Sequence, residues 1–282
     1  MSKRFAVLGS PIAHSKSPAI HLAAYRVLGL DWEYGRAEVQ KGLLRTFLAG
    51  LEDPWNGFSV TMPLKEEATR FAEVLDPYAQ LTGATNTLFQ DEFGKWHGFN
   101  TDVFGIVQAV TEARIGLVKH ALIIGSGATA TSAMVAISVL NPQAHVEVLA
   151  RNPESRKTLL ALGKKLGLKV RRAGGLRAAS RVSNLTISTL PAGSLDKQAA
   201  RMAKALFWKP KGALLDVAYN PWPSQLAAAW SAKDKRTISG LEMLIWQAVA
   251  QIRIFTTGSP ERELPNEVAV VSAMHIAVEN EQ

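Results

Sequence analysis

Cysteine is absent from the 282 residues of the chain. The sequence therefore excludes disulfides and thiolate metal ligands, and a chain without such links is compatible with a reducing cytoplasm. The six histidines show no spacing typical of a metal site, such as His-Glu-x-x-His. We therefore expect a cytoplasmic protein that holds no metal.

Long hydrophobic runs are absent as well. No stretch reaches the roughly eighteen apolar residues that a membrane helix requires. The apolar start of the chain is interrupted by Gly9 and by the polar run of residues 10–17, so no signal peptide is expected. We expect no membrane span and no membrane partner.

Acidic residues are fewer than basic ones. The sequence has 24 Asp and Glu residues and 32 Lys and Arg residues. The formal net charge is therefore +8, which favours anionic partners. The basic residues are scattered, and their short clusters, such as Lys164-Lys165, are not interleaved with aromatic side chains. This distribution favours a small anionic ligand over nucleic acid.

The length and patterning of the chain predict two α/β domains. A typical domain has roughly 100 to 200 residues, so 282 residues favour two domains. Short β-rich runs alternate with amphipathic helical runs, which indicates an α/β fold. Strands are predicted at residues 5–9, 32–39, 57–61, 85–89, 95–99, 120–125, 145–151, 185–190 and 213–217. Helices are predicted at residues 18–28, 43–51, from 65 onward, 103–113, 127–140, 155–166, 241–256 and 266–278.

A glycine-rich turn follows the strand at residues 120–125. It has the pattern Gly-x-Gly-x-x-Ala, formed by Gly125, Ser126, Gly127, Ala128, Thr129 and Ala130. Gly125 allows the tight turn, Gly127 lets backbone amides approach a pyrophosphate, and Ala130 leaves room for the helix. The alternative is a turn that uses glycine only for its geometry. The flanking strand and helix favour a dinucleotide site, whose phosphates lie at the helix N-terminus.

The end of the next strand distinguishes NAD from NADP. An NAD site usually carries Asp or Glu there, whereas this strand ends in Arg151 and Asn152. A guanidinium such as that of Arg151 can form bidentate contacts with a 2′-phosphate, so the sequence predicts NADP as cofactor. Two alternatives stay open: Arg151 is a solvated charge, or a shifted boundary places Glu147 at the strand end.

Polar clusters lie at strand ends or in loops of the first half of the chain. Each has a purely structural interpretation: Ser17 can cap a helix, Thr61 can favour β-structure, and Asn100 and Asp102 can cap the helix that follows them. Taken singly, each cluster is better explained by structure than by function.

Together and in order, the segments that carry these clusters resemble shikimate dehydrogenases. They are Gly9-Ser10-Pro11-Ile12-Ala13-His14-Ser15-Lys16-Ser17-Pro18, Ser59-Val60-Thr61-Met62-Pro63-Leu64-Lys65, Ala84-Thr85-Asn86-Thr87-Leu88 and Asn100-Thr101-Asp102. The glycine-rich turn, Tyr219-Asn220-Pro221 and the run from Gly240 to Gln247 also fit, so the resemblance spans nearly the whole chain. It implies NADPH-dependent, reversible reduction of 3-dehydroshikimate to shikimate, a step toward chorismate and the aromatic amino acids.

The resemblance also implies the domain organisation. A substrate-binding and catalytic domain, residues 1–103 and 240–282, is split around a Rossmann-like NADP-binding domain, residues 104–239, and the cleft between them holds both ligands. The domain order read from the residues alone agrees. The protein is expected to be a monomer or a homodimer.

Roles for single residues follow from the same resemblance. Lys65 and Asp102 are the implied catalytic pair. The implied substrate-binding residues are Ser15, Ser17, Thr61, Asn86, Asp102, Tyr219 and Gln247. Gly240 lines the nicotinamide pocket. Reduction of the carbonyl turns its oxygen into an alkoxide, and the Lys65 ammonium can donate the proton that this oxygen requires.

Two residues depart from the commonest family pattern. Ser59 stands where Asn usually precedes Val-Thr, and Thr85 stands where an aliphatic residue is more usual. The shorter reach of Ser59 near the substrate leaves open the choice between shikimate and quinate. A dehydrogenase that uses quinate or NAD is one alternative. A non-catalytic relative is another, although Lys65 and Asp102 argue against it.

Overall fold

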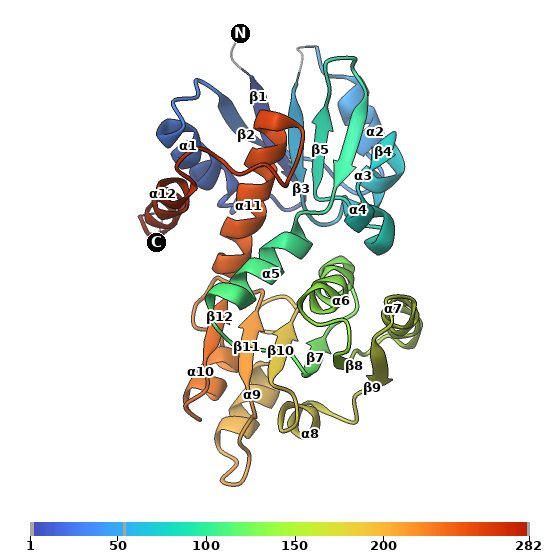
Figure 1. Ribbon diagram of the computed structural model, residues 1–282, viewed down its shortest axis with the longest axis vertical. Helices are drawn as coiled ribbons and strands as arrows, with labels where there is room; N and C mark the ends of the chain where they lie inside the picture. Colours follow the sequence, from blue (N-terminus) through green and yellow to red (C-terminus); the bar gives the residue numbers. More distant parts are fainter. Residues whose placement is uncertain (1–2, 53–54, 281–282) are drawn as a thin grey trace. The chain divides into compact units, whose positions relative to one another are not determined.

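The computed structural model describes residues 3–52 and 55–280, and the chain divides into two units. The first unit comprises Met1–Thr101 and Ile245–Gln282, and the second comprises Asp102–Leu244. Each unit contains one six-stranded sheet with helices on both faces (Figure 1). The α/β class predicted from the sequence is confirmed.

The first unit is built on a mixed sheet with the strand order β2-β1-β3-β5-β6-β4. Its strands are β1 (Arg4–Gly9), β2 (Glu33–Glu38), β3 (Gly57–Val60), β4 (Val74–Leu75), β5 (Thr87–Gln90) and β6 (Trp96–Phe99). β1 pairs in parallel with β2 and β3, whereas β5 is antiparallel to both β3 and β6. The predicted hairpin of β5 and β6 is therefore confirmed.

Apolar side chains hold helices on both faces of this sheet. The helices are α1 (Ser17–Val27), α2 (Leu44–Ala49), α3 (Lys65–Phe71), α4 (Pro77–Thr82), the later part of α11 (Gly240–Thr257) and α12 (Glu267–Glu279). On one face, Phe58 packs in a buried cluster with Leu44 of α2 and Ala68 of α3. On the other face, the Phe5 ring stacks on Phe255 of α11 with centroids 4.3 Å apart.

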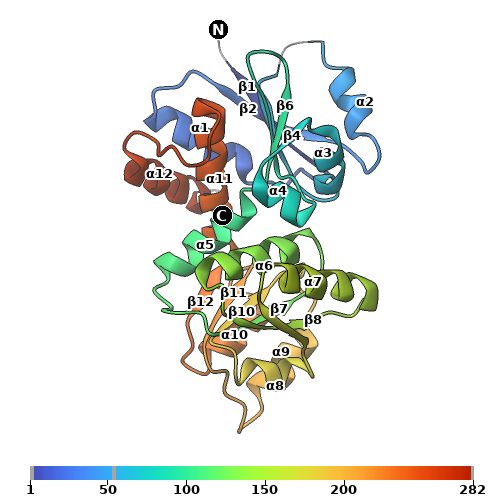
Figure 2. The same ribbon diagram turned by 45° about the vertical axis from the view of Figure 1, so that its right-hand side comes forward.

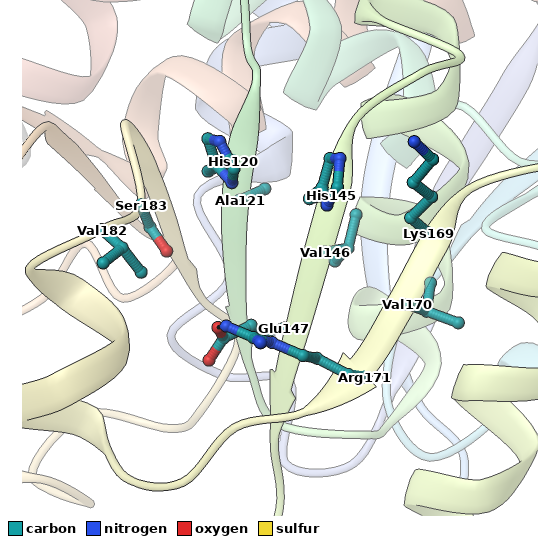
Figure 3. Close-up of a pocket in the computed structure, with 10 residues that line it drawn as sticks. All are labelled: His120, Ala121, His145, Val146, Glu147, Lys169, Val170, Arg171, Val182 and Ser183. Carbon is teal, nitrogen blue, oxygen red and sulfur yellow. Dashed lines mark hydrogen bonds and ion pairs between the residues drawn. The ribbon is translucent and has the colours of Figure 1, made fainter.

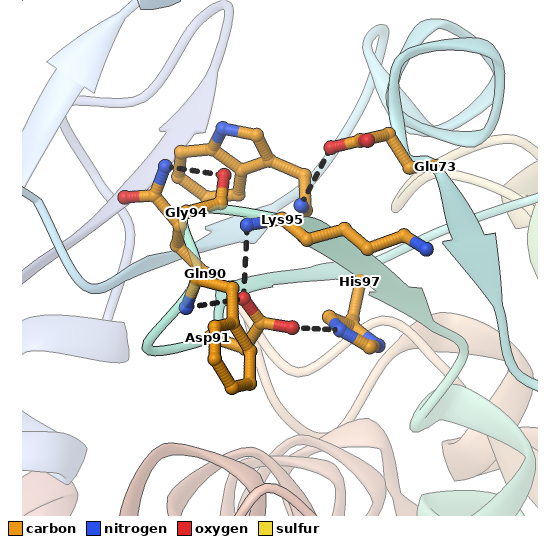
Figure 4. A network of polar contacts seen from close by, with 8 residues as sticks. Glu73, Gln90, Asp91, Gly94, Lys95 and His97 are labelled. Atoms are coloured by element: carbon orange, nitrogen blue, oxygen red, sulfur yellow. Dashed lines mark hydrogen bonds and ion pairs between the residues drawn. The ribbon is translucent and has the colours of Figure 1, made fainter.

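Hydrogen bonds of Asp91 close the turn between β5 and β6 (Figure 4). Its Oδ1 accepts from the backbone amides of Phe93 at 3.0 Å and Lys95 at 2.9 Å, and its Oδ2 lies 2.8 Å from His97 Nε2. The hydrogen bond with His97 is the largest cause that lowers the pKa of Asp91 below its ordinary value. The turn predicted at residues 91–94 is thus fixed by its own first residue.

The second unit is built on an all-parallel sheet with the order β12-β11-β10-β7-β8-β9. The strands are β7 (His120–Ile124), β8 (His145–Leu149), β9 (Lys169–Arg172), β10 (Leu185–Ser188), β11 (Ala213–Asp216) and β12 (Thr237–Ser239). β10 and β11 are buried along their whole length. Their apolar runs correctly predicted a buried parallel sheet.

Helices cover both faces of this second sheet (Figure 2). They are α5 (Asp102–Glu112), α6 (Ala128–Leu140), α7 (Pro153–Lys165), α8 (Leu176–Ser180), α9 (Asp196–Ala203) and α10 (Gln225–Ser231). α5, α6 and α7 lie on one face, and α8, α9 and α10 lie on the other. The second group buries Leu122 of β7 together with Trp208 and Trp230, so these two indoles pack in the core.

One helix cap differs from the prediction. Ser17 was expected to cap α1, but α1 begins at Ser17 itself, its N-cap residue is Lys16, and no side-chain hydrogen bond caps it. Ser17 instead uses its backbone carbonyl to bond with His21 Nδ1, one turn later, at 2.9 Å. The Ser17 hydroxyl is therefore not consumed as a helix cap.

Within the described residues, no helix is both long and apolar enough to cross a membrane.

Candidate active site

Asn86 lies at the centre of a buried polar cluster in the first unit. Its Nδ2 donates to Thr101 Oγ1 at 2.9 Å and to Gln247 Oε1 at 3.3 Å, and its Oδ1 accepts from the Thr101 amide at 2.9 Å. Asn86 and Gln247 are both buried. The fold therefore brings together two predicted substrate-binding residues that are 161 positions apart in the sequence.

Backbone hydrogen bonds fix Lys65 beside the segment that carries Asn86. The Thr61 amide donates to Leu8 of β1 at 2.8 Å, and the Leu64 amide donates to the Thr61 carbonyl at 2.9 Å. α3 then begins at Lys65, whose carbonyl accepts from the Thr85 amide at 3.0 Å. Thr61 and Lys65 are both half-buried, so their side chains lie at the edge of the core rather than in it.

Thr85, one of the two departures from the family pattern, is accommodated within the first unit. Its side chain is fully buried, and the Thr69 hydroxyl donates to its Oγ1 at 3.0 Å. The additional hydroxyl therefore has a partner inside the protein, and the backbone of Thr85 still bonds to α3.

The two serines predicted to bind the substrate, Ser15 and Ser17, lie next to each other at the start of α1. The Ser17 amide donates to Ser15 Oγ at 3.3 Å. Arg36 of β2 donates from Nε at 3.0 Å and from Nη2 at 2.7 Å to the Ser15 carbonyl, which ties this loop to the sheet. Arg36 could not be identified from the sequence, because the parallel pairing of β1 and β2 brings it to this loop.

Asp102 and Tyr219 both belong to the second unit. Asp102 is the first residue of α5 and is buried. Tyr219 lies in the loop after β11, and burial raises the pKa of its hydroxyl above the ordinary value. Asp216 and Ser224 anchor the two ends of this loop, because Ser224 Oγ donates to Asp216 Oδ2 at 2.6 Å. Neither residue of this pair was identified from the sequence.

Gly240 has a structural explanation. It is the first residue of α11, and a Cβ atom built there would collide with the Val217 carbonyl. Close approach of the two backbones therefore requires glycine at this position. The predicted contact of Gly240 with the nicotinamide stays a prediction.

The glycine-rich turn between β7 and α6 leaves space for a ligand. Gly125 has a φ of +116°, and a Cβ atom there would also collide with the Thr189 hydroxyl. Gly127 is exposed, and a Cβ atom built on it would meet no atom within 4 Å. The first amides of a helix lack intrahelical partners, so this open space at the N-terminus of α6 fits a phosphate group.

The end of β8 carries no acidic residue. β8 ends at Leu149, and the exposed Arg151 follows it. Glu147 lies within β8, is nearly buried and pairs with Arg171 of β9, so the alternative that placed Glu147 at the strand end is wrong. Asn152 caps α7, because its Oδ1 accepts from the amides of Glu154 at 2.9 Å and Ser155 at 3.1 Å.

A cavity of about 410 Å³ lies at the amino-terminal ends of β7, β8 and β9 in the second sheet (Figure 3). His120, His145 and Lys169, the first residues of β7, β8 and β9, contribute to its lining. The pKa of His120 is lowered below its ordinary value. Desolvation is the largest cause, and the electrostatic effect of the neighbouring His145 is the second. Because dinucleotides bind at the carboxyl ends of parallel strands, this cavity at the amino ends is not the predicted cofactor site.

His21 is buried in the first unit beside Ser17, whose carbonyl bonds to its Nδ1. Its ring is completely buried and stacks on Tyr34 with centroids 4.0 Å apart. Burial lowers the pKa of His21 from 6.5 to about 4. The folded protein thus holds this imidazole neutral at pH values where the unfolded chain protonates it.

We expect acid to destabilise the native protein more than a His21→Phe variant. The unfolded state takes up the proton at its ordinary pKa, so the stability due to neutral His21 is present above about pH 6.5 and is lost as the pH falls toward 4. Between pH 7 and pH 5 the free energy of unfolding should fall by about 2 kcal/mol more in the native protein. Urea unfolding of both proteins at both pH values measures this, and equal losses would contradict the expectation.

Comparisons with known proteins cover nearly the whole chain. A family model described as the shikimate dehydrogenase substrate binding domain matches residues 7–88. A shikimate dehydrogenase (NADP(+)) of Dehalococcoides mccartyi is 31% identical over 287 residues, which cover 99% of this chain and 97% of that protein.

Solved structures give the same likeness. The crystal structure of Mycobacterium tuberculosis shikimate dehydrogenase has a TM-score of 0.84 and 40% identity, and covers 97% of this chain and 99% of that one. A shikimate 5-dehydrogenase from Thermus thermophilus, in complex with NADP(H) and shikimate, has a TM-score of 0.80 and 31% identity. It covers 98% of this chain and 99% of that one, so the likeness includes both units.

Proposed function

The chain belongs to the shikimate dehydrogenase family, and on this basis we propose that it reduces 3-dehydroshikimate reversibly to shikimate with NADPH. The observation that carries the proposal is the full-length likeness to NADP-dependent relatives, one of which was solved with both ligands. The buried Asn86–Gln247 cluster and the exposed Arg151 support it from this chain's own residues.

In this proposal the first unit supplies most of the substrate-binding residues, and the segment that matches the family's substrate-binding model lies within it. Asp102 and Tyr219 come from the second unit. The second unit binds NADP at the glycine-rich turn, where Gly127 leaves the start of α6 open. Arg151 contacts the 2′-phosphate.

The substrate residues suit a small carboxylic acid with several hydroxyls. Such a ligand requires many short hydrogen-bond donors and acceptors rather than an apolar slot. Ser15 and Ser17, joined at the start of α1, are assigned to the carboxylate together with Tyr219. Thr61, Asn86, Asp102 and Gln247 are assigned to the hydroxyls.

Lys65 is assigned the proton transfer. Bound NADPH supplies a hydride to the carbonyl carbon of the substrate. The carbonyl oxygen then gains negative charge, which the Lys65 ammonium stabilises and neutralises by donating a proton; in the reverse direction the Lys65 amine accepts that proton. Asp102 is assigned as the second member of the catalytic pair, as the family resemblance implies.

We assign the protein to the cytoplasm, with small molecules rather than nucleic acid or membranes as its partners, and with a monomer or a homodimer as its assembly. Mass by light scattering distinguishes the two assemblies.

Asn86→Ala is expected to weaken shikimate binding by about tenfold or more, because the variant lacks a buried donor and leaves its former partners unsatisfied. The dissociation constant of NADP+ should stay nearly unchanged, since the glycine-rich turn is intact. Isothermal titration with each ligand measures both constants. Asn280→Ala, at the exposed C-terminal end of α12, is the control and should bind shikimate normally. Equal shikimate affinity in the Asn86 variant and the native protein would remove Asn86 from the site.

A further inference from the structure

A chain of hydrogen bonds runs through the core of the first unit, starting at Tyr34 of β2. Its Oη donates to Ser59 Oγ of β3 at 2.6 Å, and Ser59 Oγ donates to Gln251 Oε1 of α11 at 2.7 Å. All three side chains are buried, with exposed fractions of 6%, 4% and 1%. The hydrogen bonds of this series all point from Tyr34 toward Gln251, because the Ser59 hydroxyl has a single proton and donates it to Gln251.

Gln251 extends this chain to Asn86. Its Nε2 donates to the Asn86 carbonyl and to Thr87 Oγ1, both at 3.1 Å. The Thr87 hydroxyl then donates to Asn86 Oδ1 at 2.9 Å. Asn86 Oδ1 thus accepts from the Thr87 hydroxyl as well as from the Thr101 amide, and Asn86 Nδ2 donates to Thr101 Oγ1 and Gln247.

We propose that Tyr34, Ser59 and Gln251 are positioning residues that fix the orientation of the Asn86 side-chain amide for shikimate binding. The proposal rests on the proposed function, which gives Asn86 its ligand. An amide can turn over and exchange its oxygen and nitrogen, and the surrounding donors select one orientation. Because the bonds in such a buried chain strengthen one another, removing one hydroxyl weakens the selection at its far end.

The same network explains how Ser59 acts. Ser59 was expected near the substrate, with a reach shorter than that of Asn. Its hydroxyl accepts from Tyr34 and donates to Gln251, so in this proposal its influence on the substrate passes through Asn86. Burial raises the pKa of the Tyr34 hydroxyl, which keeps its proton available to Ser59.

Tyr25 provides a matched control for Tyr34. It lies in the same aromatic cluster, with ring centroids 6.4 Å apart, and it is equally buried. Within the part of the chain that the structure describes, however, its hydroxyl has no hydrogen-bond partner. Tyr34→Phe and Tyr25→Phe therefore each remove one buried hydroxyl from the same environment, but only the first breaks the chain to Asn86.

The test is steady-state kinetics of shikimate oxidation by the two variants beside the native protein. Tyr34→Phe should raise the KM for shikimate about fivefold, the effect of one net hydrogen bond, while kcat and the KM for NADP+ stay nearly unchanged. Tyr25→Phe should change none of the three constants. Equal behaviour of the two variants overturns the proposal, as does a loss in Tyr34→Phe that falls on kcat or on NADP+.

A double-variant cycle tests whether the residues act in series. Ser59→Ala should raise the KM for shikimate at least as much as Tyr34→Phe, and adding Tyr34→Phe to Ser59→Ala should cause no further rise. Additive effects would mean separate roles and would overturn the proposal. Ser59→Thr, which keeps the hydroxyl, should restore most of the affinity. If Ser59→Ala fails to fold, the isosteric Tyr34→Phe still decides.

The native protein in the same experiment distinguishes failure of the positioning role from failure of the proposed function. Turnover of shikimate by the native protein, with equal constants in Tyr34→Phe and Tyr25→Phe, overturns only the positioning role. No turnover of shikimate by the native protein overturns the proposed function, and the positioning role with it.

Discussion

Lys65→Ala should lower kcat for shikimate oxidation by about 10²- to 10⁴-fold, the usual contribution of a positioned acid or base. The side chain carries the proton that the substrate oxygen loses in this direction, and alanine cannot replace it. Initial rates at saturating ligands measure the loss. The dissociation constant of NADP+, measured by calorimetry, should stay nearly unchanged, because Lys65 lies in the first unit and the glycine-rich turn in the second.

Two further variants separate proton transfer from charge. Lys65→Arg keeps a positive charge, but a guanidinium stays protonated, so this variant should remain nearly as inactive as Lys65→Ala. Lys41→Ala removes an exposed lysine from the same unit and should be fully active. Activity near that of the native protein in Lys65→Ala would refute the assignment, and high activity in Lys65→Arg would show that charge alone suffices.

Arg151→Ala should raise the KM for NADP+ by about 10- to 100-fold, since charge-assisted hydrogen bonds contribute about 1.5 to 3 kcal/mol. The weak activity with NAD+, which has no 2′-phosphate, should not change. At saturating NADP+ the variant should recover nearly full kcat, because Arg151 binds the cofactor without taking part in the reaction.

Arg181→Ala is the matched control for this variant. Arg181 is an exposed arginine of the same unit, at the C-terminal end of α8, and its removal should leave both cofactor constants unchanged. If Arg151→Ala retains the native KM for NADP+, then Arg151 is only a solvated charge at the end of β8.

Much of the fold could be predicted because periodicity and turn chemistry are local. The predicted apolar runs correspond to β10 and β11 in the structure. The glycine-rich turn lies between β7 and α6, as predicted. β9 escaped prediction because its residues, Lys169–Arg172, are mostly charged and look like a loop, although they form an edge strand. β4, β12, α4, α8, α9 and α10, which span two to eight residues each, also went unpredicted.

The candidate site was less accessible to local reasoning. Ser15, Lys65, Asn86 and Gln247 were identified through the family resemblance, since no spacing in the sequence brings Asn86 to Gln247. Arg36 and Gln251 were missed because each acts through contacts with residues far away in the sequence. The prediction that Ser17 caps α1 was wrong because it relied on local propensity alone. The helix begins at Ser17 itself.

The proposed reaction can be tested by the absorbance of NADPH while the purified protein receives shikimate or quinate, each with NADP+ or NAD+. We expect a strong rise with shikimate and NADP+ and only weak signals with the other three pairs. A rise chiefly with quinate or with NAD+ would contradict the assigned substrate or the role of Arg151. No rise with any pair would contradict the proposed enzyme.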